Sequence, residues 1–270
     1  MGRKPTHTVG NRPVGGGDRE QPLDRRAMRK RGVLRALGEE LSEARAFADA
    51  NTMRRLRRVN AIAATAFVIG GSLFALGAGL AQGDVGSPRL VAGVYLVGGV
   101  FFSSGGYASL LQVVNGPRQG PGGSFLAGRW RWWSAEPGRL EWLSALVLFV
   151  GTLVFAINLL DSLVADLSPA QFDRLVWSPD MTGCALFLVS GHLAMVEISG
   201  GWLPCWRPRD LGWRIVAVNQ LGSVLFMVSA VATFVRADGD MIAIGIANWG
   251  TLTGALCFAV AGVMQEFERP

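Results

Sequence analysis

Six uncharged apolar runs, each about as long as a bilayer is thick, constrain this chain more than any other feature of its sequence. They cover roughly residues 61–81, 90–114, 142–160, 181–196, 215–235 and 241–264. A helix rises about 1.5 Å per residue, so about 20 residues cross a hydrocarbon core of about 30 Å. The fourth run is short: it draws Glu197 toward the interface, sits in a thinned bilayer, or extends backwards through Trp177. The pattern predicts an all-α membrane protein with six transmembrane helices and excludes a water-soluble globular fold.

The basic residues predict the orientation of these spans. Of 26 Lys and Arg, 15 precede Asn60, four lie between the second and third spans, three between the fourth and fifth, and one in the C-terminal tail. The other three loops hold one each, and the loop after the third span also carries Asp161, Asp166, Asp173 and Asp180. Because Lys and Arg accumulate on the cytoplasmic side, both termini are predicted to be cytoplasmic.

Composition divides the rest of the chain. Residues 1–32 are rich in Gly, Pro and Arg and predict a disordered basic arm, and apolar residues at helical spacing predict a juxtamembrane helix over 33–59. The arginine cluster at 54–58 sets topology or, alternatively, recruits anionic lipid. The remaining segments are hairpin 1 (60–116), a cytoplasmic linker (117–141), hairpin 2 (142–200), a second linker (201–213) and hairpin 3 (214–270).

A threefold internal repeat relates the three predicted hairpins. Residues 137–199, moved forward by 71 positions without a gap, match residues 208–270 at 11 of 63 positions. The matches spell P-x-x-L-x-W before the odd-numbered span, G-x-x-x-F within it, and G-x-x-x-F-x-x-x-G within the even-numbered one. The first hairpin keeps Gly70 and Phe74, then Gly98, Phe102 and Gly106.

The repeated glycines predict close helix packing. Residues four apart lie on one helix face, and glycine there lets two backbones approach. Each even-numbered helix is therefore expected to pack against its own partner or the next hairpin, with phenylalanines filling the grooves opposite. The expected packing residues are Gly70, Gly98, Gly106, Gly151, Gly183, Gly191, Gly222, Gly254 and Gly262.

Two further sets of repeat positions lie near the predicted cytoplasmic face. Trp142 and Trp213 begin their spans and are interpreted as interfacial anchors. Gln112, Glu197 and Glu268 end the three even-numbered helices. Around an axis along the membrane normal they would converge into a polar ring; otherwise each side chain lies at the water interface without a joint role.

The sequence carries no pattern typical of a catalytic or metal centre. Cys184, Cys205 and Cys257 stand far apart without a CxxC, and His192 is the one histidine in a span. HExxH, phosphate-loop and Ser-His-Asp patterns are missing. We expect no catalysis, no cofactor, no metal and no nucleic-acid binding. Membrane lipids are the predicted partners, with anionic lipid a further option at the basic arm; the identity of any protein partner is unknown.

The last hairpin resembles the YrhK-like domain of small bacterial integral membrane proteins. The similarity is carried by Asn219-Gln220-Leu221-Gly222-Ser223, by Asn248-Trp249-Gly250 and by residues 254–258. It covers about the last 60 residues well, the middle hairpin weakly, and the first hairpin only through its glycines. The resemblance implies a bacterial inner-membrane location and no established activity. The predicted function is a non-enzymatic membrane scaffold or interaction protein; the alternative is a small-ion or solute channel or transporter with the polar ring at its cytoplasmic mouth.

Overall fold

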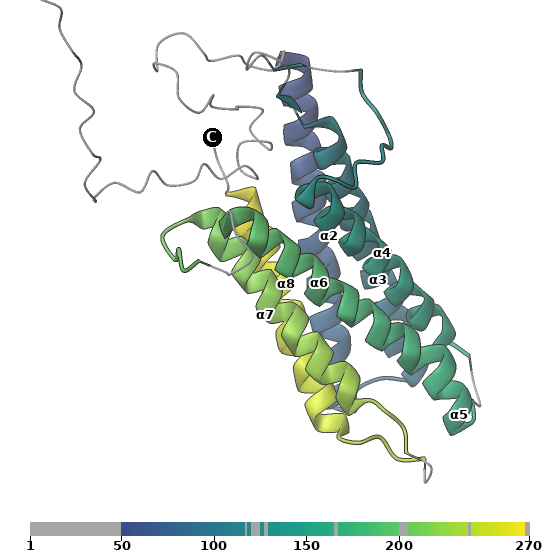
Figure 1. The fold of residues 1–270 in the computed structure, drawn as a ribbon. Helices are drawn as coiled ribbons and strands as arrows, with labels where there is room; N and C mark the ends of the chain where they lie inside the picture. Colours follow the sequence, from purple (N-terminus) through teal and green to yellow (C-terminus); the bar gives the residue numbers. More distant parts are fainter. Residues whose placement is uncertain are drawn as a thin grey trace, which may run out of the picture.

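Six long helices make up most of the computed structural model, which describes residues 50–116, 118–119, 125–126, 129–164, 167–199, 205–236 and 239–267 (Figure 1). They are α2 (Ala50–Gln82), α3 (Pro88–Asn115), α4 (Leu140–Asp161), α6 (Ser178–Ser199), α7 (Leu211–Ala232) and α8 (Ile244–Glu266). Six helical stretches of the described chain are long and apolar enough to cross a membrane. The all-α prediction is therefore confirmed, and the chain is a multi-pass membrane protein. The predicted basic arm lies outside the described residues.

The first span is longer than predicted, because α2 runs without a break across the expected boundary at residue 60. Residues 50–69 contain neither Pro nor Gly, so nothing in the local sequence interrupts the helix. The described part of the predicted juxtamembrane helix is thus the first turns of α2. The rest of that segment, 33–49, lies outside the described residues.

The fourth span begins well before residue 181. A short helix α5 (Pro169–Phe172) and a π-helical segment η2 (Asp173–Trp177) lead directly into α6, and together they form one stretch from Pro169 to Ser199. Ser168 starts it with a capping box: its hydroxyl accepts from the Gln171 N–H and the Gln171 side chain accepts from the Ser168 N–H. Of the three explanations for the short fourth run, extension through Trp177 is the one confirmed. Asp173 and Asp180, predicted in a loop, lie on this helical stretch.

The turn between α7 and α8 is longer than predicted. α7 ends at Ala232 and α8 begins at Ile244, whereas the sequence suggested 235 and 241. Between them the backbones of Val235 and Met241 pair, and Gly239 adopts a φ of +92°. That left-handed conformation suits glycine, so the residue at this position favours the turn.

In the linker before α4, two short antiparallel strands pair, β1 (Arg118–Gln119) and β2 (Phe125–Leu126).

The helices form a closed ring. Each packs against the next in the order α2, α3, α4, α6, α7, α8, and α8 returns to α2. We call the end at which α2 begins and α8 ends the terminal end, and the opposite end the loop end (Figure 1). The described arginines gather at the terminal end: Arg54, Arg55, Arg57, Arg58, Arg129, Arg131, Arg139, Arg207, Arg209 and Arg214. Arg89, Arg174 and Arg236 lie at the loop end.

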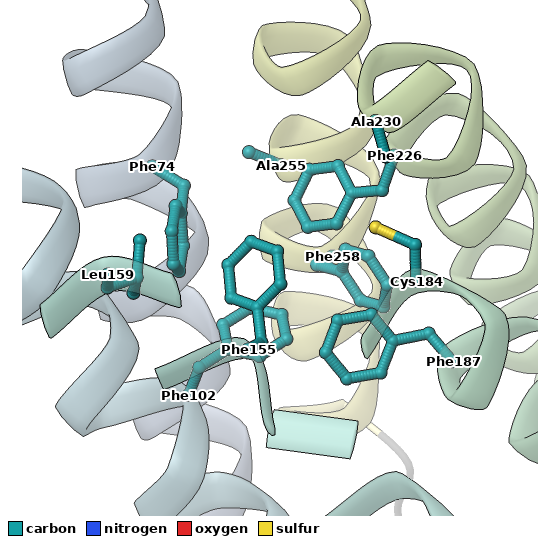
Figure 2. Packing of buried hydrophobic residues seen from close by; sticks show 10 residues of the cluster. All are labelled: Phe74, Phe102, Phe155, Leu159, Cys184, Phe187, Phe226, Ala230, Ala255 and Phe258. Carbon is teal, nitrogen blue, oxygen red and sulfur yellow. The ribbon is translucent and has the colours of Figure 1, made fainter. Parts of the chain in front are cut away.

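The centre of the ring is filled by phenylalanine side chains, one from each long helix (Figure 2). Adjacent rings meet mostly edge to face or tilted, with centroids 5.1–6.2 Å apart, which is the favourable range for aromatic pairs. We call this set the phenylalanine cluster; its members are Phe74, Phe102, Phe155, Phe187, Phe226 and Phe258. These are the phenylalanines of the repeat. Each lies against a glycine of the partner helix in its own hairpin, as predicted, and the six rings also meet one another at the centre.

The first glycine of each repeated pair faces the preceding helix. A Cβ on Gly98 would lie 3.2 Å from the carbonyl oxygen of Gly70, one on Gly183 3.3 Å from that of Gly151, and one on Gly254 3.0 Å from that of Gly222. Such distances leave no room for a larger residue without movement of the backbone. The α2–α3, α4–α6 and α7–α8 contacts are therefore made in the same way.

The second glycine of each pair faces the following helix. A Cβ on Gly106 of α3 would lie 3.3 Å from Cα of Phe149 on α4, and one on Gly262 of α8 3.1 Å from the carbonyl oxygen of Ala64 on α2. Gly191 of α6 lies against the side chain of Gln220 on α7. The two glycines of α3, of α6 and of α8 thus contact both neighbouring helices. The contact of Gly262 with α2 closes the ring.

Candidate functional site

A cavity of about 100 Å³ lies inside the ring, between the phenylalanine cluster and the terminal end. All six long helices contribute to its lining, and Phe187 and Phe258 of the cluster form its floor. A water molecule needs about 10–15 Å³ of such volume, so the cavity has room for several waters or a small ligand. Its polar lining residues are Ser109, Gln112, Glu141, Ser144, Ser190, Glu197, Asn219, Ser223 and Gln265.

Two of the three residues predicted to form a polar ring, Gln112 and Glu197, line this cavity. Glu268 lies outside the described residues. Gln265, almost one turn earlier on α8, lines the cavity and was not predicted from the sequence.

Three amide side chains, two of them buried, form a cluster beside the cavity. Oδ1 of Asn60 accepts from Nε2 of Gln112 at 3.0 Å and from Nε2 of Gln265 at 3.1 Å. Gln112 and Gln265 are 7% and 4% exposed, so these bonds satisfy amides that have little access to bulk water. The cluster connects α2, α3 and α8, the helices at which the ring closes. Asn60 was missed because a polar residue at the start of a span is ordinarily interfacial.

A second carboxylate, Glu141, lines the cavity from the first turn of α4. Its Oε2 accepts from Nε of Arg139 at 3.3 Å, and Arg139 also pairs with Glu136 of the linker. An ion-pair network on the linker therefore reaches the wall of the cavity. The only sequence signal for Glu141 was its place within the P-x-x-L-x-W motif, at a position that the repeat leaves variable.

Two serines connect α4 and α6 across the cavity wall. The Ser144 hydroxyl donates to the carbonyl oxygen of Ser190 at 3.0 Å, and the Ser190 hydroxyl donates to that of Ser144 at 2.9 Å. Both side chains are buried. Reciprocal bonds of this kind fix the two helices in register, which keeps the polar lining of α4 and α6 facing inward.

Trp142 and Trp213 have a different role from the predicted one. They are only 6% and 9% exposed, so they are not lipid-facing anchors. Each indole N–H donates to a backbone carbonyl eight residues earlier, Ser134 at 2.8 Å and Cys205 at 2.7 Å. The two tryptophans therefore hold each linker against the start of the following helix, while Trp132, Trp133 and Trp206 of the same linkers are exposed (69%, 54% and 80%).

The chemical groups that line the cavity are carboxylates, amides and hydroxyls above an aromatic floor. Within the described ranges no group of three His, Cys, Asp or Glu side chains is placed to hold a metal ion. Cys184, Cys205 and Cys257 form no disulfide, and His192 is exposed on α6. Carboxylates and amides above an aromatic floor can bind a small polar or cationic molecule.

Comparisons of the chain with protein-family models, with curated proteins and with solved structures find no match. The cavity and the phenylalanine cluster are accordingly interpreted from their own geometry.

Proposed function

We propose that this chain is a non-enzymatic membrane scaffold or interaction protein of the YrhK-like type. The observation that carries the proposal is the phenylalanine cluster, which occupies the axis of the ring with one side chain from each long helix. A channel needs a path along this axis, whereas interlocked aromatic rings hold helices in one arrangement. A fixed bundle of this kind supports a function that depends on a stable surface.

We also propose a bacterial inner-membrane location with both termini in the cytoplasm. The gathering of arginines at the terminal end supports the orientation, because Lys and Arg accumulate on the cytoplasmic side. The resemblance of the last hairpin to the YrhK-like domain supports the location. The three equivalent glycine contacts support an origin from three repeated hairpins.

Anionic lipid is the proposed partner of the basic N-terminal arm. Arg54, Arg55, Arg57 and Arg58 continue the charge of the arm into the first turns of α2. Basic residues near an anionic surface each contribute about 1 kcal/mol to membrane attachment. Membrane lipids cover the apolar outer faces of the helices in any case.

Site-specific photo-crosslinking in living cells tests the scaffold function. A photoreactive residue in place of exposed Trp206, on the linker before α7, should yield a discrete adduct with another protein. The same residue in place of exposed Val260, on the outer face of α8, is the control and should yield none. Identical adduct patterns at the two positions would contradict a specific partner surface.

The cavity favours a second candidate function, a small-ion or solute channel or transporter. Gln112 and Glu197 line it, and Glu268 continues the repeat. In proteoliposomes the scaffold proposal expects no flux above protein-free liposomes. Flux that is lost in the Glu197→Gln, Glu268→Gln double variant would favour the channel, and unchanged flux in that variant would refute the polar ring as its mouth.

A further inference from the structure

Three of the four serines that line the cavity donate their hydroxyl hydrogen to the protein itself. Ser144 and Ser190 each donate to the backbone carbonyl oxygen of the other. Ser223 donates to that of Asn219 at 3.0 Å. A hydroxyl carries one hydrogen, so these three side chains have none left to donate to a ligand, although their oxygens can still accept. The serines of the lining therefore favour a ligand that donates hydrogen bonds.

The carboxylates and amides of the lining supply acceptors in excess. Glu141 and Glu197 line the cavity, and an ionised carboxylate only accepts hydrogen bonds, at about four positions. A carboxylate that already has a partner can therefore accept further bonds. Gln112 and Gln265 use N–H groups in their bonds to Asn60, which does not occupy their carbonyl oxygens. The lining as a whole thus offers a ligand more acceptors than donors.

The charged side chains of the lining are both acidic, because no Lys, Arg or His of the described residues lines the cavity. The wall at Gly191 has a further acceptor behind it. Oε1 of Gln220 lies against this glycine, is buried, and accepts no hydrogen bond from a described residue. The oxygen of an amide carries partial negative charge, which acts strongly where water is excluded. Charge and hydrogen bonding therefore both favour a positively charged ligand.

The floor of the cavity is apolar and aromatic. Phe187 and Phe258 form it, with ring centroids 6.2 Å apart (Figure 2). Phe67 of α2 also contributes to the lining. A cavity of about 150 Å³ takes up benzene, so one of about 100 Å³ suits a ligand of about four non-hydrogen atoms. A ligand that matches both the floor and the acceptors is short, with an apolar part and a cationic part.

We propose that this cavity binds one small primary alkylammonium ion. An ammonium group has three hydrogen-bond donors, no acceptor and a positive charge, so it complements the carboxylates and amide oxygens of the lining. The alkyl chain packs against the aromatic floor. Binding of this kind goes beyond the scaffold function and needs no passage along the axis of the ring. Binding without flux in proteoliposomes therefore supports this site even where the channel proposal fails.

Isothermal titration calorimetry of the purified full-length protein in mild detergent tests the proposal. Near neutral pH, n-propylammonium chloride should bind about tenfold or more tightly than propan-1-ol and sodium propionate, its neutral and anionic analogues. n-Hexylammonium exceeds the cavity and should bind more weakly, whereas partitioning into detergent strengthens with each added methylene group. Equal affinities for n-propylammonium and propan-1-ol, or tighter binding of the longer amine, would overturn the proposal.

Two charge-removing variants locate the site. Glu197→Gln keeps the size of a cavity-lining side chain but removes its charge, so it should weaken n-propylammonium binding about tenfold or more. Glu266→Gln is the matched control, because Glu266 is exposed at the same end of the bundle, accepts from the Thr65 hydroxyl at 3.0 Å and does not line the cavity. Equal losses in the two variants, or wild-type affinity in Glu197→Gln, would overturn the proposal. The comparison of ligands uses the wild-type protein alone, so it decides the matter even if Glu197→Gln does not fold.

Discussion

The glycines of α8 provide a matched pair of substitutions that measures how tightly the helices pack. A Cβ on Gly254 would lie 2.6 Å from Cδ1 of Phe226 and 3.0 Å from the carbonyl oxygen of Gly222, both on α7. At Gly245, on the same helix, no atom lies within 4 Å of the position a Cβ would take. We predict that Gly254→Ala destabilises the protein and that Gly245→Ala does not.

The size of the effect follows from two contributions to the free energy of unfolding. Both substitutions share the first, and only Gly254→Ala has the second. Replacing a helical glycine by alanine favours the helix by about 0.5–1 kcal/mol at either position, so this term cancels. Carbon atoms pack best at about 3.5–4.0 Å, well beyond the contact at Gly254. Phe226 is 3% exposed and held by the phenylalanine cluster, and the Gly222 contact is backbone, so neither yields easily. Overpacking of this kind costs about 1–3 kcal/mol, which is the expected difference between the variants.

Thermal unfolding of both variants, purified in the same mild detergent, measures this difference. For a chain of this size 1 kcal/mol corresponds to about 2–4 °C, so Gly254→Ala should unfold about 2–12 °C below Gly245→Ala. Equal unfolding temperatures would refute the close approach of α7 and α8. A larger loss in Gly254→Leu than in Gly254→Ala would extend the same reasoning.

Three further measurements test other parts of the structure. Phe258→Ala removes a ring of the phenylalanine cluster and should cost about 3–5 kcal/mol, against little for exposed Leu256→Ala on the same helix; equal losses would contradict the central packing. Gln112→Leu removes a donor to Asn60 and should cost about 0.6–1.7 kcal/mol in the same assay, and wild-type stability would contradict the amide cluster. Val164→Cys, at an exposed loop-end position in a chain with its native cysteines replaced, should react with a membrane-impermeant thiol reagent in intact cells; labelling only after lysis would reverse the orientation.

The helices of this protein were largely predictable because their signals are local. Runs of apolar residues and the Gly and Phe spacing within them are properties of single segments, and every predicted span overlaps one long helix. The start of the fourth helical stretch was not predictable in the same way. Asp173 and Asp180 interrupt its hydropathy, so the apolar run begins at residue 181 although the helical stretch begins at Pro169.

The candidate cavity was only half predictable. Gln112 and Glu197 were found because the repeat gives them equivalent positions at the ends of their helices. Asn60 and Gln265 were missed because their hydrogen bond joins residues 205 positions apart, on the first and last helices of the ring. Residue type alone does not distinguish such an amide from one that lies at the water interface.

The sequence by itself determined which segments cross the membrane, which residues allow two helices to approach, and which side chains occupy equivalent positions. These are consequences of segment length, residue size and spacing. Only the tertiary structure decided that the six phenylalanines meet at one centre, that Trp142 and Trp213 are buried, and that a cavity with a polar lining lies beside the cluster. The reason is that spacing defines a face of a helix but not the partner of that face, which is set by the closure of the ring between α8 and α2.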